Sequence, residues 1–236
     1  MPSPYDYEPL AQGWLAVRAR IAAAARAAGR DPESVALLAV SKTFGAEAVR
    51  GAHALGQRAF GENYVQEASA KMAATSDLAG IEWHLIGPLQ GNKAGEAAAR
   101  FAWVHTIDRI RIAQRLAAAR PEGLPPLAVC VQVNISGETS KSGVAPEDAL
   151  ALAREVALLP RLALRGLMGI AEPTSEAAVQ RAQFARLRQL LEACVAEGLP
   201  VDTLSMGMSA DLEAAIAEGA TLVRVGTAIF GARPGK

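Results

Sequence analysis

The segment SVALLAVSK, residues 34–42, is a short run of aliphatic and β-branched side chains that ends in a lysine. The segment AEAVRGAHALG, residues 46–56, follows it with apolar residues at helical spacing and closes on a glycine. The first pattern indicates a buried β-strand and the second an amphipathic helix. An ammonium group at the end of a buried strand is costly to desolvate unless it is paired or neutral. Lys42 therefore needs either a structural partner or a chemical role.

The same alternation of apolar runs and helical segments continues along the chain. A first helix is predicted over residues 8–28, ending at Gly29. The runs that we expect to be strands are residues 34–42, 58–64, 81–87, 103–108, 126–136, 163–170, 203–209 and 221–231.

These runs are apolar throughout instead of alternating, which is typical of a parallel sheet covered on both faces. Roughly eight βα units in a chain of this length favour a closed (β/α)₈ TIM barrel. A doubly wound open sheet is the competing interpretation, because the number of strands does not prove closure. No linker or shift in composition divides the chain, so we predict a single domain over residues 1–236.

The composition excludes several classes of protein. Hydrophobic residues make up 51% of the chain and charged residues 20%, and 24 basic residues balance 24 acidic ones. This balance argues against a protein held to nucleic acid or to a membrane by net charge. No signal peptide and no membrane-length apolar run is seen, so we expect a cytoplasmic protein. Cys130 and Cys194 are expected to be buried thiols, and no residue cluster has metal-ligand spacing.

Polar residues gather where the predicted strands end. In a TIM barrel, such positions meet at the C-terminal face, where active sites lie. Lys42 would stand at the mouth of that barrel. One interpretation is an amine kept neutral by apolar surroundings, ready to form a Schiff base with a carbonyl compound. The alternative is a lysine paired with a barrel carboxylate such as Glu62.

The last two predicted strands favour a bound anion. SMGMSADL, residues 205–212, leads into a helix whose first turn is expected to carry Ser209 and Asp211. RVGTAIFG, residues 224–231, places Gly226 and Thr227 just after Arg224. Small residues, hydroxyls and a helix N-terminus suit a phosphate, and barrels often bind phosphate after strands seven and eight. The competing interpretation is that the glycines only make tight turns. Together with Lys42, the pattern points to a ligand with an aldehyde and a phosphate, such as pyridoxal phosphate (PLP).

Several long motifs then occur in order: FGENYVQE, WHLIGPLQGNK, VNISGETSKSG, GLMGI and LSMGMSADLEAAIAEGATLVRVGTAIFGAR. With Lys42, they make residues 35–233 resemble the pyridoxal phosphate homeostasis protein family. The resemblance implies a barrel like the N-terminal domain of alanine racemase, with PLP held as an aldimine on Lys42. It places Arg224 opposite the pyridine nitrogen. The other cofactor-binding positions that it implies are Asn63, Ser205, Met206, Ser209, Gly226 and Thr227. The family often has histidine where this chain has Pro88.

Two features favour a carrier of PLP over a catalyst, so no catalytic residue is assigned. Arg224 cannot accept the proton of the ring nitrogen, which weakens the cofactor as an electron sink. Alanine racemases also take a catalytic tyrosine from a second domain, for which we expect no counterpart in this chain, and Tyr64 belongs to a different loop. The resemblance thus implies a protein of PLP homeostasis, which we expect to be a monomer that passes PLP to apo-enzymes. The alternatives are a PLP-dependent amino-acid racemase of low activity and, more remotely, a phosphosugar-binding barrel.

Three further polar residues have open roles. Lys141 follows the fifth predicted strand and is either a secondary lysine for the cofactor or a surface residue. His84 and His105 lie in predicted strands, where a hydrogen-bonded structural role is favoured over a catalytic one.

Overall fold

The computed structural model describes residues 7–137 and 142–232 and forms a closed barrel of parallel strands. The strands are β1 (Ala36–Val40), β2 (Ala59–Glu62), β3 (Glu82–Leu85), β4 (Trp103–Ile107), β5 (Leu127–Val133), β6 (Leu162–Gly169), β7 (Thr203–Ser205) and β8 (Leu222–Val225). The α-helices are α1 (Glu8–Ala27), α2 (Ala46–Ala54), α3 (Val65–Ala74), α4 (Ala94–Arg100), α5 (Ile110–Ala119), α6 (Ala149–Ala157), α7 (Ala177–Ala196), α8 (Leu212–Ala217) and α9 (Thr227–Phe230). Three short 3₁₀ turns are η1 (Pro32–Ser34), η2 (Gly91–Lys93) and η3 (Pro146–Asp148).

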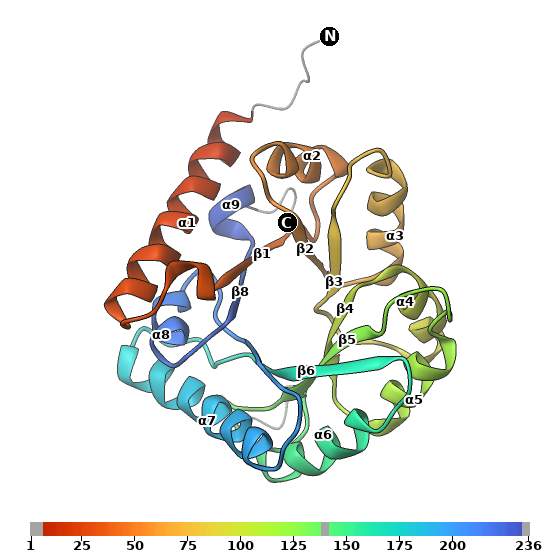
Figure 1. The fold of residues 1–236 in the computed structure, drawn as a ribbon. Helices are drawn as coiled ribbons and strands as arrows, with labels where there is room; N and C mark the ends of the chain where they lie inside the picture. The colour runs from red at the N-terminus through yellow and green to blue at the C-terminus, as the bar shows by residue number, and fades with distance from the viewer. Residues whose placement is uncertain (1–6, 138–141, 233–236) are drawn as a thin grey trace.

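Closure of the sheet is set by the two partners of β1. Ala39 of β1 is in register with Phe60 of β2, and Leu38 is in register with Arg224 of β8, both in parallel. The helices form an outer ring around the strands (Figure 1). The predicted TIM barrel is therefore confirmed. The open sheet is excluded because the last strand, β8, pairs with the first, β1, so that the strand order closes on itself. Each observed strand overlaps a predicted apolar run, since strands that face helices on one side and the barrel interior on the other must be apolar on both.

Helix α1 lies beside the end of the chain that closes the barrel. It ends as predicted, because Gly29 adopts a φ of 67° that favours glycine. Gly13 of α1 faces α9, and a Cβ at this position would lie 2.6 Å from the carbonyl oxygen of Ala228. The absence of a side chain thus lets α1 approach the turn that follows β8, which is one wall of the site described below.

The predicted boundaries after β7 and β8 need correction. The run 221–231 is not one strand: it divides into β8 and the short helix α9, with Gly226 at the boundary. Ser209 and Asp211 do not lie in the first turn of α8 but precede it. The Asp211 side chain accepts a hydrogen bond from the backbone N–H of Met208, which closes a turn before the helix begins. An aspartate before a helix often satisfies backbone groups in this way.

Among the described residues, Cys130 and Cys194 are both buried and free, as predicted. Burial raises the pKa of the Cys130 thiol to about 12, so it stays protonated at neutral pH. Within the same residues, no helix is long and apolar enough to cross a membrane, and no group of three or more potential metal ligands occurs.

Candidate functional site: a lysine-bearing cavity at the C-terminal end of the barrel

A cavity of about 290 Å³ lies at the C-terminal end of the barrel. It brings together side chains from segments that are far apart in the sequence. Six of the eight positions predicted as cofactor-binding line it: Lys42, Asn63, Ser209, Arg224, Gly226 and Thr227. The walls between them include the apolar side chains of Ile86, Ile170 and Met208. An apolar pocket with a few converging polar groups is typical of a small-molecule site.

The two remaining predicted positions, Ser205 and Met206, do not line the cavity. Both are completely buried. Ser205 instead contacts Arg224, and Met206 belongs to the hydrophobic core. Lys141 lies outside the described residues.

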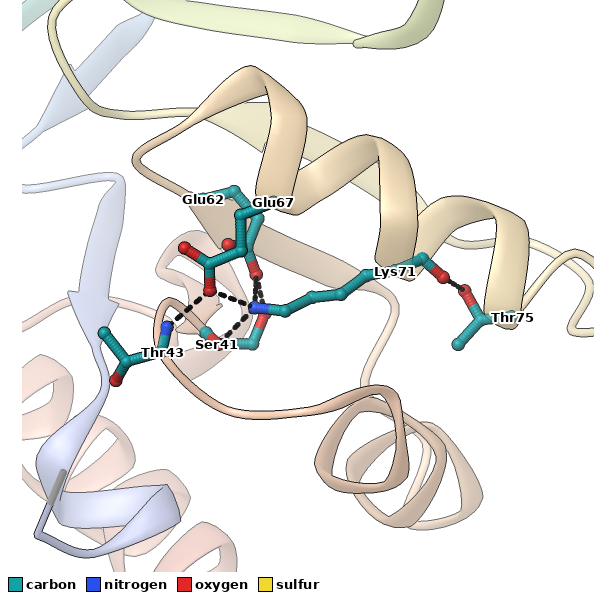
Figure 2. A network of polar contacts seen from close by, with 6 residues as sticks. All are labelled: Ser41, Thr43, Glu62, Glu67, Lys71 and Thr75. Atoms are coloured by element: carbon teal, nitrogen blue, oxygen red, sulfur yellow. Dashed lines mark hydrogen bonds and ion pairs between the residues drawn. The ribbon is translucent and has the colours of Figure 1, made fainter. Parts of the chain in front are cut away.

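Lys42 lies two residues beyond the end of β1, and its chain neighbours are held by a group of side chains that we call the Lys42 clamp. The clamp consists of Ser41, Thr43, Glu62, Glu67 and Lys71 (Figure 2). Lys71 Nζ donates to the carbonyl oxygen of Ser41 at 2.7 Å, to Glu62 Oε1 at 2.7 Å and to Glu67 Oε1 at 2.8 Å. The backbone N–H of Thr43 donates to the same Glu67 oxygen at 2.6 Å. The backbone is therefore fixed on both sides of Lys42.

Glu62 lies at the buried base of the clamp. Its Oε1 accepts from Ser41 Oγ at 2.6 Å in addition to Lys71, whereas its Oε2 is buried without a hydrogen-bond partner among the described residues. Burial raises the pKa of this carboxyl group, and the positive charge of Lys71 opposes that effect. The ion pair that sequence analysis considered for Glu62 is thus made here with Lys71, from helix α3.

Thr43 takes an unusual backbone conformation beside Lys42. Its φ is 69°, in the left-handed region that β-branched residues rarely adopt. The hydrogen bond from its N–H to Glu67 helps to hold this conformation. Strained residues of this kind concentrate at functional sites, where surrounding contacts compensate for the energy of the strained backbone.

Arg224 forms a cationic part of the cavity wall. It comes from β8, near the end of the chain, whereas Lys42 follows β1. Its NH1 group donates to the carbonyl oxygen of Ser205 and, at 2.9 Å, to Ser205 Oγ, while NH2 donates to the carbonyl oxygen of Gly169 at 2.9 Å. Burial lowers the pKa of the Arg224 guanidinium to about 10, against the opposing charge of Asp211. The side chain therefore remains a fixed, protonated donor at neutral pH.

The turn from β8 into α9 gives the cavity its backbone donors. A Cβ at Gly226 would lie 3.0 Å from the carbonyl oxygen of Val40, so glycine allows β8 and the end of β1 to come close here. Helix α9 begins at Thr227, and the first N–H groups of a helix lack partners within it. Gly226 and Thr227 therefore supply a small, polar corner suited to an anion.

A second cavity of about 250 Å³ adjoins the first, with which it shares Asn63, Ile86 and Ile170. Pro88, the position at which this chain departs from the family pattern, lines the second cavity and not the first. Pro88 is therefore not part of the wall of the lysine-bearing cavity.

Sequence reasoning missed two parts of the site. Ile86 and Ile170 lie in predicted strand runs to which the sequence assigns no binding role, yet both line the cavity. Nothing in the sequence indicated that Lys71 is buried at the site, because a lysine in an amphipathic helix normally points to solvent. Its burial follows only from the packing of α3 over the end of β1.

A closed parallel barrel with a lysine and a buried arginine on the wall of one cavity defines a class of small-molecule-binding barrel proteins. The family model for the alanine racemase N-terminal domain matches residues 15–234. The pyridoxal phosphate homeostasis protein of Pseudomonas aeruginosa is 62% identical over 224 residues, which is 95% of this chain and 96% of that protein. The protein of the same name from Escherichia coli K12 is 53% identical over 95% of this chain and 97% of that one.

Among solved structures, PipY of Synechococcus elongatus PCC7942 with PLP bound is 40% identical, with a TM-score of 0.82 over 94% of this chain and all of that one. The chain therefore belongs to the pyridoxal phosphate homeostasis protein family, as the motifs predicted.

Proposed function

We propose that this protein binds PLP covalently and reversibly through Lys42, and serves as a carrier in PLP homeostasis in the cytoplasm. The observation that carries the proposal is the convergence of Lys42, Arg224 and the Gly226–Thr227 corner on one cavity. The PLP bound to PipY, a relative of 40% identity, supports the same ligand for this chain.

The residues that line the cavity fit the chemical groups of PLP. Gly226, Thr227 and Ser209 offer hydroxyl and backbone donors for the phosphate. Ile86 and Ile170 offer apolar surfaces for the pyridine ring, and Arg224 offers a donor for the ring nitrogen. Ser205 would act through Arg224, and Met206 through the packing of the hydrophobic core.

Lys42 would supply the covalent bond. Its deprotonated amine would attack the aldehyde carbon of PLP and form a C=N bond, with the aldehyde oxygen leaving as water. The Lys42 clamp fixes the backbone from which the side chain extends, so the amine reaches the cavity from a constant position. PLP bound in this way supplies electron-withdrawing chemistry when its ring nitrogen is protonated.

Arg224 favours a carrier over an enzyme. Its pKa of about 10 keeps the guanidinium protonated at neutral pH, so it donates to the ring nitrogen and does not protonate it. A racemase would also need a second acid or base opposite Lys42. Tyr64, the tyrosine closest in sequence to the rim segments, is 62% exposed, and no described contact directs it into the cavity. We further propose that the protein acts as a monomer and delivers PLP to apo-enzymes.

Replacement of Lys42 tests this proposal. Purified protein would be incubated with PLP, reduced with borohydride and mapped by peptide mass spectrometry. Wild-type protein should carry the adduct on the Lys42 peptide, and Lys42→Ala should carry none while keeping its fold by circular dichroism. Lys93→Ala, a lysine that does not line the cavity, is the matched control and should retain the adduct.

An adduct that persists in Lys42→Ala on any residue other than Lys141 would contradict the assignment. Turnover of an amino acid by the wild-type protein, lost in Lys42→Ala, would instead support the racemase alternative.

A further inference from the structure

A line of hydrogen-bonded side chains crosses the barrel interior from its N-terminal rim to Arg224. Glu82 Oε1 contacts His84 Nε2 at 2.9 Å, and His84 Nδ1 contacts His105 Nε2 at 2.9 Å. His105 Nδ1 contacts Ser205 Oγ at 2.8 Å, and Ser205 Oγ accepts from Arg224 NH1 at 2.9 Å. Strands β3, β4, β7 and β8 each contribute to this line. It joins a rim residue, half-exposed Glu82, to the wall of the candidate site.

The two ends of the line dictate the direction of every hydrogen bond in it. A carboxylate only accepts, so the proton of a neutral His84 is on Nε2 and its Nδ1 accepts. His105 must then donate from Nε2, which leaves its Nδ1 to accept from the Ser205 hydroxyl. With its proton committed to His105, Ser205 Oγ presents lone pairs to Arg224, which only donates. All donors thus point from Arg224 toward Glu82.

The interior groups are held neutral by burial. Desolvation lowers the pKa of His84, against the hydrogen bond and the charge of Glu82. Desolvation also lowers the pKa of His105 well below its ordinary value, and the charge of Arg224 acts in the same direction. Glu82 is held ionised, because its hydrogen bond from His84 lowers its pKa. The line therefore has one stable protonation pattern at neutral pH.

We propose that Glu82, His84, His105 and Ser205 form a trans-barrel relay that fixes the orientation of Arg224 in the cavity. These four are positioning residues, and their role toward PLP rests on the proposed function. If Ser205 lost its partner at His105, its hydroxyl proton would be free to turn toward the guanidinium. Arg224 would then lose an acceptor in a dry environment, where an unpaired donor is costly.

The direction of the relay is measurable without any ligand. Histidine-ring ¹⁵N NMR of the unliganded protein distinguishes the two neutral tautomers, and His53→Asn leaves only the two relay histidines. We expect both His84 and His105 to carry their proton on Nε2 at pH 7. A proton on Nδ1 of either ring, or a charged ring, would overturn the proposal.

Variants at the two ends test whether the relay acts on Arg224. Ser205→Ala removes the acceptor itself and should raise the PLP dissociation constant roughly tenfold, the size of one buried hydrogen bond to a charged group. Ser205→Ala should also shift the absorption maximum of bound PLP. Glu82→Leu, at the opposite rim, should shift this maximum in the same direction as Ser205→Ala and weaken PLP binding several-fold. Glu82→Gln keeps an acceptor for His84 and should restore most of both.

A purely structural role for Glu82 would lower the melting temperature and leave the absorption maximum and affinity unchanged, which would overturn the proposal. Ser205→Ala, a small change in a packed position, supplies the test if Glu82→Leu does not fold. Failure of wild-type protein to form the Lys42 adduct would count against the proposed function, whereas the NMR result decides the relay independently.

Discussion

The Lys42 clamp and the trans-barrel relay support different walls of one cavity, and they are built from different groups. The clamp has two carboxylates, Glu62 and Glu67, that share the ammonium of Lys71. The relay has neutral imidazole and hydroxyl groups between Glu82 and Arg224. The clamp joins the segment after β1 to β2 and α3, whereas the relay runs across the whole barrel.

The difference shows how burial selects the chemistry of a support. Near the rim, Glu67 is partly exposed, and charges there retain some hydration. In the barrel centre, His105 is fully buried, and a charge would cost several kcal/mol without a close partner. Neutral groups with fixed hydrogen-bond directions can orient Arg224 through that region with a smaller desolvation penalty than charged groups. The clamp should therefore respond to loss of charge, and the relay to pH.

Removal of the clamp lysine should have the largest effect on stability. Lys71→Met leaves the Glu62 carboxylate buried without its cation, so the free energy of unfolding should fall by about 3 kcal/mol or more. Urea denaturation followed by circular dichroism measures this. Adding Glu62→Gln to Lys71→Met should recover much of the loss, because the uncompensated charge is then gone.

Arg100→Met is the matched control for that measurement. Arg100 pairs with Glu96 at the same helical spacing, but both side chains are at least one-third exposed. Loss of such a pair should cost less than about 1 kcal/mol. Equal losses for Lys71→Met and Arg100→Met would mean that the clamp is no more than a surface ion pair.

The relay should make stability fall as the solution becomes acidic. His105 has a lowered pKa in the folded protein, so below about pH 6.5 the unfolded chain binds a proton that the folded protein does not. Stability is then lost as pH falls from 7 to 5, by up to about 2 kcal/mol for one histidine that stays neutral. In His105→Leu, denaturation at the two pH values should show a correspondingly smaller loss. Parallel curves for the two proteins would contradict this.

The strained residue of the clamp should have the smallest effect. Thr43→Gly relieves a left-handed φ that costs a β-branched residue about 1–2 kcal/mol, against about 0.5–1 kcal/mol of added chain entropy. The melting temperature should therefore rise slightly, whereas Thr43→Ala, which keeps the strain, should not raise it. A clear fall for Thr43→Gly would show that the strain at this position is negligible.

Much of the fold and part of the site were predictable from local pattern. Apolar runs located all eight strands, because a parallel strand is buried on both faces. Lys42 was recognised because it ends such a run, whereas Arg224 and Gly226 were recognised from the small and polar residues within the last run and from the family motifs. The boundary between β8 and α9 was missed, since TAIF is apolar and suits a strand as well as a helix. Which of Ser205 and Ser209 reaches the cavity also had no local signal.

The sequence by itself determined the order of strands and helices and the polar residues at their ends, because both depend on periodicity along the chain. Only the tertiary structure decided that the sheet closes, that Lys71 turns inward to Glu62, and that His105 meets Ser205, 100 positions away in the chain. Contacts of this kind depend on strand register and barrel curvature, which place side chains face to face without leaving any pattern in the neighbouring residues.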